Sequence, residues 1–82
     1  MTFVVTNESW LPVRDAVVEC FDLDNPDNVL LRATTDKGGV ATFESSDISG
    51  IASGVRYFFR PDVRRASNGH HNGVLRLNQV QF

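Results

Sequence analysis

The feature that most constrains the fold of this chain is the shortness of its apolar runs. Runs of about four to eight residues are bounded by clusters of Gly, Asn, Asp and Pro, and no segment shows an apolar repeat of helical period. This pattern is typical of β-strands joined by turns. Because 82 residues leave room for one domain, we predict a single β-sandwich domain over residues 1–82.

Alternation of apolar and polar residues within the runs predicts six or seven short strands. The strands are expected at 2–6, 13–23, 29–35, 40–44, 55–60 and 73–82, with turns at 7–12, 24–28 and 36–39, a loop at 61–72, and room for one helical turn within 45–54. Strands that follow one another without intervening helices pair antiparallel. The predicted fold class is therefore all-β, a small Greek-key sandwich of the immunoglobulin-like or prealbumin-like kind.

Three segments carry a family resemblance. Residues 11–18 contain Pro-Val-x-x-Ala-x-Val, residues 35–43 read Thr-Asp-x-x-Gly-x-Ala-x-Phe, and residues 54–59 read Gly-x-x-Tyr-x-Phe. In this order the chain resembles the transthyretin-like or carboxypeptidase-regulatory-like sandwiches, a group that includes the B-type repeats of bacterial surface adhesins. The resemblance implies a fold and not a function, because these residues form turns and core in that family.

No catalytic or cofactor motif is recognisable in the sequence. The adjacent His70 and His71 are expected in a solvated or interface loop, although histidines brought together across an oligomer are an alternative metal site. Asp22, Asp24 and Asp27 lack calcium-loop spacing and read as turn residues. We therefore predict no enzyme activity, no cofactor and no metal ion.

Cellular location is inferred from cysteine use and from the absence of a leader. Cys20 is the only cysteine, so no disulfide can form within the chain, and its apolar strand predicts a buried side chain. The N-terminal residues lack a signal peptide, and the apolar runs are far too short to span a membrane. A chain starting at Met1 is expected to stay in the cytoplasm and to be assembled there.

The formal charge of -2 marks neither nucleic acid nor a membrane as the partner. The charges are unevenly spread, with acids concentrated in residues 1–55 and arginines in residues 56–82. They are expected to pair or hydrate within one fold, and the alternative is a pair of patches that meet neighbouring subunits.

The apolar side chains exceed what one face of each strand needs. The inward positions supply a core of Phe3, Val5, Ala16, Val18, Cys20, Leu31, Ala33, Ala41, Phe43, Tyr57, Phe59, Leu75 and Leu77. The outward positions hold Val4, Val17, Phe21, Phe58, Val74, Val80 and Phe82, with Trp10 and Leu11 in a turn. Either bulges and loops cover this second set, or it forms an exposed patch that binds protein.

We interpret the chain as a non-catalytic structural or protein-binding module. Its expected partner-binding residues are Trp10, Phe21, Phe58, Arg60, Arg64, Arg65 and Phe82. By size and fold class it resembles the small immunoglobulin-like decoration (cement) proteins of phage capsids, which implies a virion location, a trimer and contacts with the major capsid protein. The alternative is a carbohydrate- or ligand-binding accessory domain of a larger secreted enzyme or adhesin.

Overall fold

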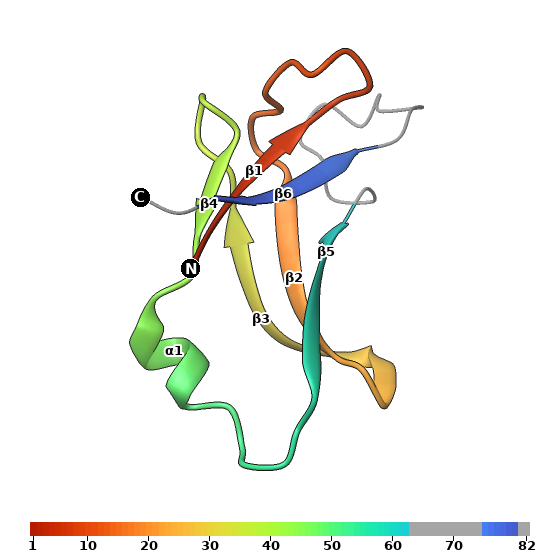
Figure 1. The fold of residues 1–82 in the computed structure, drawn as a ribbon, viewed down its shortest axis with the longest axis vertical. Helices are drawn as coiled ribbons and strands as arrows, with labels where there is room; N and C mark the ends of the chain where they lie inside the picture. Colours follow the sequence, from red (N-terminus) through yellow and green to blue (C-terminus); the bar gives the residue numbers. More distant parts are fainter. Residues whose placement is uncertain (63–74, 81–82) are drawn as a thin grey trace.

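Two small antiparallel β-sheets face each other across an apolar core (Figure 1). The computed structural model describes residues 1–62 and 75–80. Its elements are β1 (Thr2–Thr6), β2 (Val17–Asp22), β3 (Asn25–Thr34), β4 (Val40–Thr42), α1 (Ser45–Ser49), β5 (Tyr57–Asp62) and β6 (Arg76–Val80). One sheet has the order β4-β1-β6 and the other has the order β3-β2-β5. The predicted all-β fold is confirmed, and α1 lies where the sequence leaves room for one helical turn.

The two ends of the molecule carry different connections. Figure 1 shows the β1–β2 loop and the β3–β4 turn at one end, with α1 and the β2–β3 turn toward the other. Both connections at the first end carry the chain from one sheet to the other. The β4–β5 connection, which contains α1, also runs from one sheet to the other.

The core is built from the inward positions of both sheets, as strand alternation predicts. Val5 of β1 and Val18 and Cys20 of β2 are fully buried. Burying a side chain of this size contributes about 1.5–3 kcal/mol relative to leaving it exposed. The prediction that Cys20 is a buried apolar residue is confirmed.

Four aromatic side chains, those of Phe3, Phe43, Tyr57 and Phe59, pack together in the core. The Phe59 ring of β5 lies 4.7 Å from the Phe3 ring and 5.2 Å from the Phe43 ring, measured between centroids. The Tyr57 ring meets the Phe59 ring edge-on at 5.9 Å. Such tilted and edge-on arrangements are favourable for aromatic pairs, and here they join β5 of one sheet to β1 of the other.

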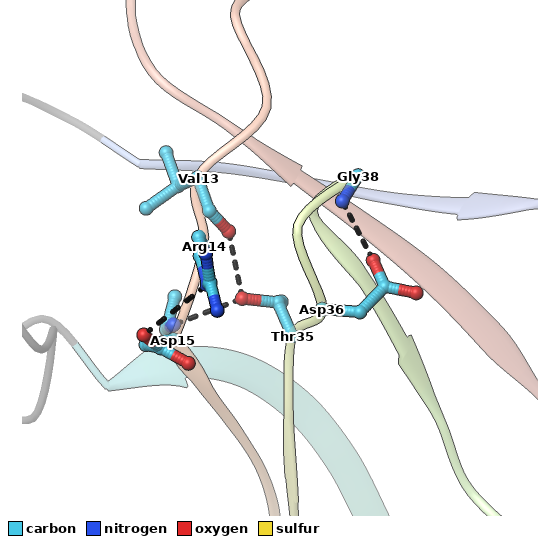
Figure 2. A network of polar contacts seen from close by, with 7 residues as sticks. Val13, Arg14, Asp15, Thr35, Asp36 and Gly38 are labelled. Carbon is cyan, nitrogen blue, oxygen red and sulfur yellow. Dashed lines mark hydrogen bonds and ion pairs between the residues drawn. The ribbon is translucent and has the colours of Figure 1, made fainter.

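Thr35 ties together two of the crossings between the sheets, the one from β1 to β2 and the one from β3 to β4. Its hydroxyl donates a hydrogen bond to the carbonyl oxygen of Val13 at 2.7 Å and accepts one from the backbone N–H of Ala16 at 2.9 Å (Figure 2). The backbone N–H of Thr35 also donates to the carbonyl oxygen of Ala16 at 2.8 Å. Thr35 is 3% exposed, so these bonds satisfy polar groups that water does not reach.

The segment around Thr35 also explains why β2 begins at Val17 and not at the predicted residue 13. Residues 13–16 form the crossing from β1, with a turn in which Asp15 has a left-handed φ of 58°. A strand cannot continue through that conformation.

β3 begins earlier than predicted. The connection from β2 is the two-residue turn of Leu23 and Asp24, and the expected turn over 24–28 is wrong beyond Asp24. The register with β2 shifts around Phe21 and bypasses Leu30, so Leu30 and Leu31 both pack against the core. Pro26 fits within β3 because β3 is an edge strand, where a residue without an N–H is tolerated.

β5 runs two residues past its predicted end. It includes Pro61, which stands opposite Val18 of β2, and it ends at Asp62. β5 is likewise an edge strand, so Pro61 is accommodated there as Pro26 is in β3.

Replacing Thr35 by Val should remove both hydroxyl hydrogen bonds while keeping the side-chain shape. The carbonyl of Val13 and the N–H of Ala16 then stay buried without that partner, so the free energy of unfolding should fall by about 2–4 kcal/mol. Thr35→Ser keeps the hydroxyl and should lose about 1 kcal/mol. Urea denaturation followed by circular dichroism measures both variants, and a Val variant as stable as the Ser variant would contradict the assignment.

Gly39→Ala should destabilise the chain more than Gly54→Ala. Both glycines have positive φ, 76° and 87°. A Cβ at Gly39 would lie 2.7 Å from the carbonyl oxygen of Val5 and 3.0 Å from Cβ of Pro12, whereas a Cβ at Gly54 meets nothing within 4 Å. We expect a loss of about 1–2 kcal/mol at Gly54 from backbone strain alone, and a clearly larger loss at Gly39, by urea denaturation. Equal losses would mean that the contact with Val5 is unimportant.

Candidate protein-binding surface

Phe58 is the large aromatic side chain that β5 turns outward. Strand alternation sends its neighbours Tyr57 and Phe59 toward the core, and Phe58 lies on the outer face of the β3-β2-β5 sheet. It is 63% exposed. An aromatic ring left this open on a sheet face is a candidate contact residue for another protein.

Phe21 stands opposite Phe58 in the register between β2 and β5, but it is not open to solvent. Its exposure is only 9%, and the guanidinium carbon of Arg60 lies 4.2 Å from the centre of its ring. Of the two alternatives for the outward apolar set, cover and not exposure holds for Phe21. The residue does point outward, and a cation–π contact with Arg60 covers it.

Arg60 belongs to a charge cluster centred on Glu19. Glu19 of β2 is 1% exposed and lies in register between Arg32 of β3 and Arg60 of β5. Its carboxylate accepts a hydrogen bond from Nε of Arg60 at 3.1 Å and lies 3.5 Å from Nε of Arg32. Nη2 of Arg60 also donates to the carbonyl oxygen of Pro26 at 2.8 Å. Two arginines thus share one buried carboxylate. Their positive charges offset the cost of removing the carboxylate from water.

An apolar groove opens between β5 and β6, which belong to different sheets and do not pair with each other. Its volume is about 300 Å³. The described lining residues are Phe3, Phe58, Phe59, Arg60, Pro61, Leu77 and Gln79. We call this feature the β5–β6 groove. Phe58 and Arg60 on its rim belong to the predicted site, whereas the groove itself could not be read from the sequence.

Trp10 lies elsewhere, in the loop between β1 and β2. It is 63% exposed and Leu11 beside it is 59% exposed. The guanidinium carbon of Arg76, at the start of β6, lies 4.4 Å from the centre of an indole ring. Trp10 has a left-handed φ of 65°, which is rare for a bulky side chain.

The predicted site residues do not form one patch. Phe21, Phe58 and Arg60 gather on the β3-β2-β5 sheet, whereas Trp10 stacks with Arg76 of the other sheet. Arg64, Arg65 and Phe82 lie outside the described residues, as do His70 and His71. Leu11 was expected in the outward apolar set but not among the contact residues, and Arg76 was not expected in either.

Cys20, Asp22 and Asp24 each have a structural role in the described segments. Burial raises the pKa of the Cys20 thiol, which makes its reactive thiolate scarce at neutral pH. Asp22 accepts a hydrogen bond from the backbone N–H of Asp24, and Asp24 pairs with Arg56. The hydrogen bond from Arg56 lowers the pKa of Asp24. Across residues 1–62 and 75–80, no three His, Cys, Asp or Glu side chains converge as metal ligands.

Comparisons with protein-family models, curated proteins and solved structures find no match to this chain. In the part of the chain that the structure describes, no helix has the length and apolar character needed to cross a membrane.

Arg60→Met should destabilise the chain more than Arg32→Met. Loss of Arg60 leaves the buried Glu19 without its shorter hydrogen bond and uncovers Phe21, so we expect a loss of about 2–3 kcal/mol. Arg32 is half-exposed and lies farther from Glu19, so its loss should be about 1 kcal/mol or less. Urea denaturation measures both variants.

A second substitution separates the charge effect from lost packing. Glu19→Gln should stabilise the Arg60→Met variant because it removes the buried charge that has lost its partner. In the wild type, Glu19→Gln should lower the free energy of unfolding, because it weakens the contacts with both arginines. If it lowers the free energy of unfolding of the Arg60→Met variant as well, the buried charge is not the source of that variant's loss.

Proposed function

We propose that this chain is a non-catalytic structural module that works through protein–protein contacts, with copies of itself and with a larger protein shell. The single observation that supports this proposal is the exposure of Phe58 at the rim of the β5–β6 groove. Aromatic and arginine side chains are enriched at protein interfaces and supply much of their binding energy. Phe58 and Arg60 bring both kinds to one place.

The surface around Phe58 combines an apolar groove with a fixed arginine side chain, as the centre of a protein interface often does. Phe59, Pro61 and Leu77 make the groove apolar, and burying a fully exposed Phe contributes about 1.5–3 kcal/mol. Arg60 is held in place by Glu19 and Pro26, so little side-chain freedom is lost when a partner covers it. A preorganised rim beside an apolar groove favours binding to a protein surface.

The finer fold assignment belongs to the same proposal. Each sheet joins strands from separate parts of the chain, β1 with β4 and β6, and β2 with β3 and β5. This connectivity supports a Greek-key sandwich of the transthyretin-like kind. The Thr35–Gly39 segment, part of the motif that carries the resemblance, forms the turn expected of it.

The narrower role is that of a decoration protein on a phage capsid, placed as a trimer and bound to the major capsid protein. Support for it comes from chain size and the β-rich fold, by analogy. A module of this kind needs contacts to itself, and the exposed Phe58 supplies an anchor for them.

Light scattering over a range of concentrations tests the proposed self-contact. Wild-type protein should show a mass that rises with concentration above the 9.1 kDa of one chain. Phe58→Ser should shift this rise to at least about 30-fold higher concentration, the effect expected of an interface anchor. Its free energy of unfolding should stay within about 0.5 kcal/mol of wild type, because the ring is exposed.

Leu23→Ser is the matched control. Leu23 is also an exposed apolar residue, but it lies in the β2–β3 turn and does not line the groove. This variant should associate like wild type. A wild-type mass of one chain at every concentration would rule out self-contact, and equal effects of the two variants would remove Phe58 from the interface.

A further inference from the structure

Two turns of this chain have the same backbone hydrogen bonds. In the first, the N–H of Trp10 donates to the carbonyl oxygen of Asn7 at 3.0 Å, and the N–H of Asn7 donates to the carbonyl oxygen of Leu11 at 2.9 Å. The Asn7 side chain accepts from the N–H groups of Ser9 and Leu11 at 2.8 and 3.1 Å. We call residues 7–11 the Trp10 turn.

The β3–β4 turn repeats this arrangement with Asp36 in the place of Asn7. The backbone N–H of Gly39 donates to the carbonyl oxygen of Asp36 at 2.9 Å, and the backbone N–H of Asp36 donates to the carbonyl oxygen of Val40 at 3.0 Å. The Asp36 side chain accepts from Gly38, as Figure 2 shows, and from Val40. Trp10 and Gly39 thus occupy equivalent positions, and both have positive φ.

The comparison isolates what is unusual about Trp10. A turn of this kind favours Gly at the left-handed position, and Gly39 occupies that position in the β3–β4 turn. In the Trp10 turn the same position holds the single tryptophan of the sequence, whose side chain is 63% exposed. The backbone of the turn does not need an indole, and the contact with Arg76 leaves most of the side chain exposed, so we look for a further use of it outside the turn.

The β5–β6 groove offers an apolar space beside a cluster of two arginines and one carboxylate. It is apolar, open, and large enough for one big side chain, and no residue of the Trp10 turn lines it. Glu8 is exposed two residues before Trp10. Arg60 lines the groove, and its guanidinium also contacts Glu19, the carbonyl oxygen of Pro26 and the ring of Phe21. Among the residues that the structure describes, Arg32 and Arg60 form ion pairs with one shared carboxylate, that of Glu19. An incoming Glu8 would therefore meet a net positive cluster.

We propose that Trp10 of one copy inserts into the β5–β6 groove of a second copy, with Glu8 facing Arg60. This inference rests on the proposed self-contact and gives it a geometry. Because the two contacting surfaces are different, the interface is head-to-tail, and such an interface can close into a ring. A trimer requires this kind of contact, since a two-fold contact pairs copies only in twos.

The single tryptophan makes the contact directly observable. As wild-type protein is concentrated, the emission of Trp10 should move to shorter wavelength and its quenching by acrylamide should decrease, in parallel with the rise in mass. An emission spectrum that stays unchanged while the mass rises overturns the inference, because Trp10 then remains in water.

Two variants test the head-to-tail geometry. Trp10→Gly removes the indole and suits the positive φ, so the turn should still form. It should weaken self-association by about 30-fold or more. Phe58→Ser damages the groove and keeps Trp10. Circular dichroism confirms that each variant is folded before the two are combined.

Mixing the two variants gives the decisive result. The Phe58→Ser chain still offers Trp10 and the Trp10→Gly chain still offers an intact groove, so an equimolar mixture should form a species with the mass of two chains. Only the Phe58→Ser chain carries the indole, and its emission should shift on mixing. A mixture that stays monomeric overturns the inference.

The outcomes separate this inference from the proposed function. If Phe58→Ser abolishes association and Trp10→Gly leaves it unchanged, self-contact through Phe58 stands and the insertion of Trp10 is refuted. If wild type stays monomeric, both are refuted.

A charge reversal gives an independent measurement. Glu8→Lys should weaken association about tenfold at low salt, and high salt should reduce this difference. An effect of the same size at all salt concentrations would argue against the facing of Glu8 and Arg60.

Discussion

The hydroxyl of Thr35 is the interaction on which the arrangement of the two sheets depends. It bonds the crossing from β1 to β2 and belongs to the crossing from β3 to β4, so it holds these two connections between the sheets at one point (Figure 2). The buried position makes each bond hard to replace with water. Gly39 continues the same segment and packs against Val5 and Pro12, which brings the β3–β4 turn onto the β1–β2 loop.

The outer face of the β3-β2-β5 sheet is organised by a second interaction, the sharing of Glu19 between Arg32 and Arg60. A carboxylate with 1% exposure on an outward face is possible because long arginine side chains lie across it. The same Arg60 covers Phe21, which leaves Phe58 as the open ring of that pair. The electrostatic cluster therefore decides which aromatic side chain of this pair stays exposed.

The sequence was a good guide wherever local alternation decided the outcome. β1 has its predicted bounds, and the inward positions of β2 and β5 follow the pattern. The start of β3 was missed because turn-forming residues and Pro26 are acceptable in an edge strand, and edge position depends on the whole sheet. Whether Phe21 is covered or exposed was left open by the sequence, because its cover comes from Arg60, far away in the chain. The groove and the backbone of Trp10 likewise depend on contacts between distant segments, which a one-dimensional pattern does not contain.

Pro61 has a consequence for how copies of the chain can join. An edge strand with a full set of N–H groups is a template for open-ended cross-β growth. The proline ring deletes one donor from β5, and a neighbouring strand that tried to add there would leave an acceptor unmatched. Pro61 therefore disfavours open-ended growth by addition of strands along the free edge of β5.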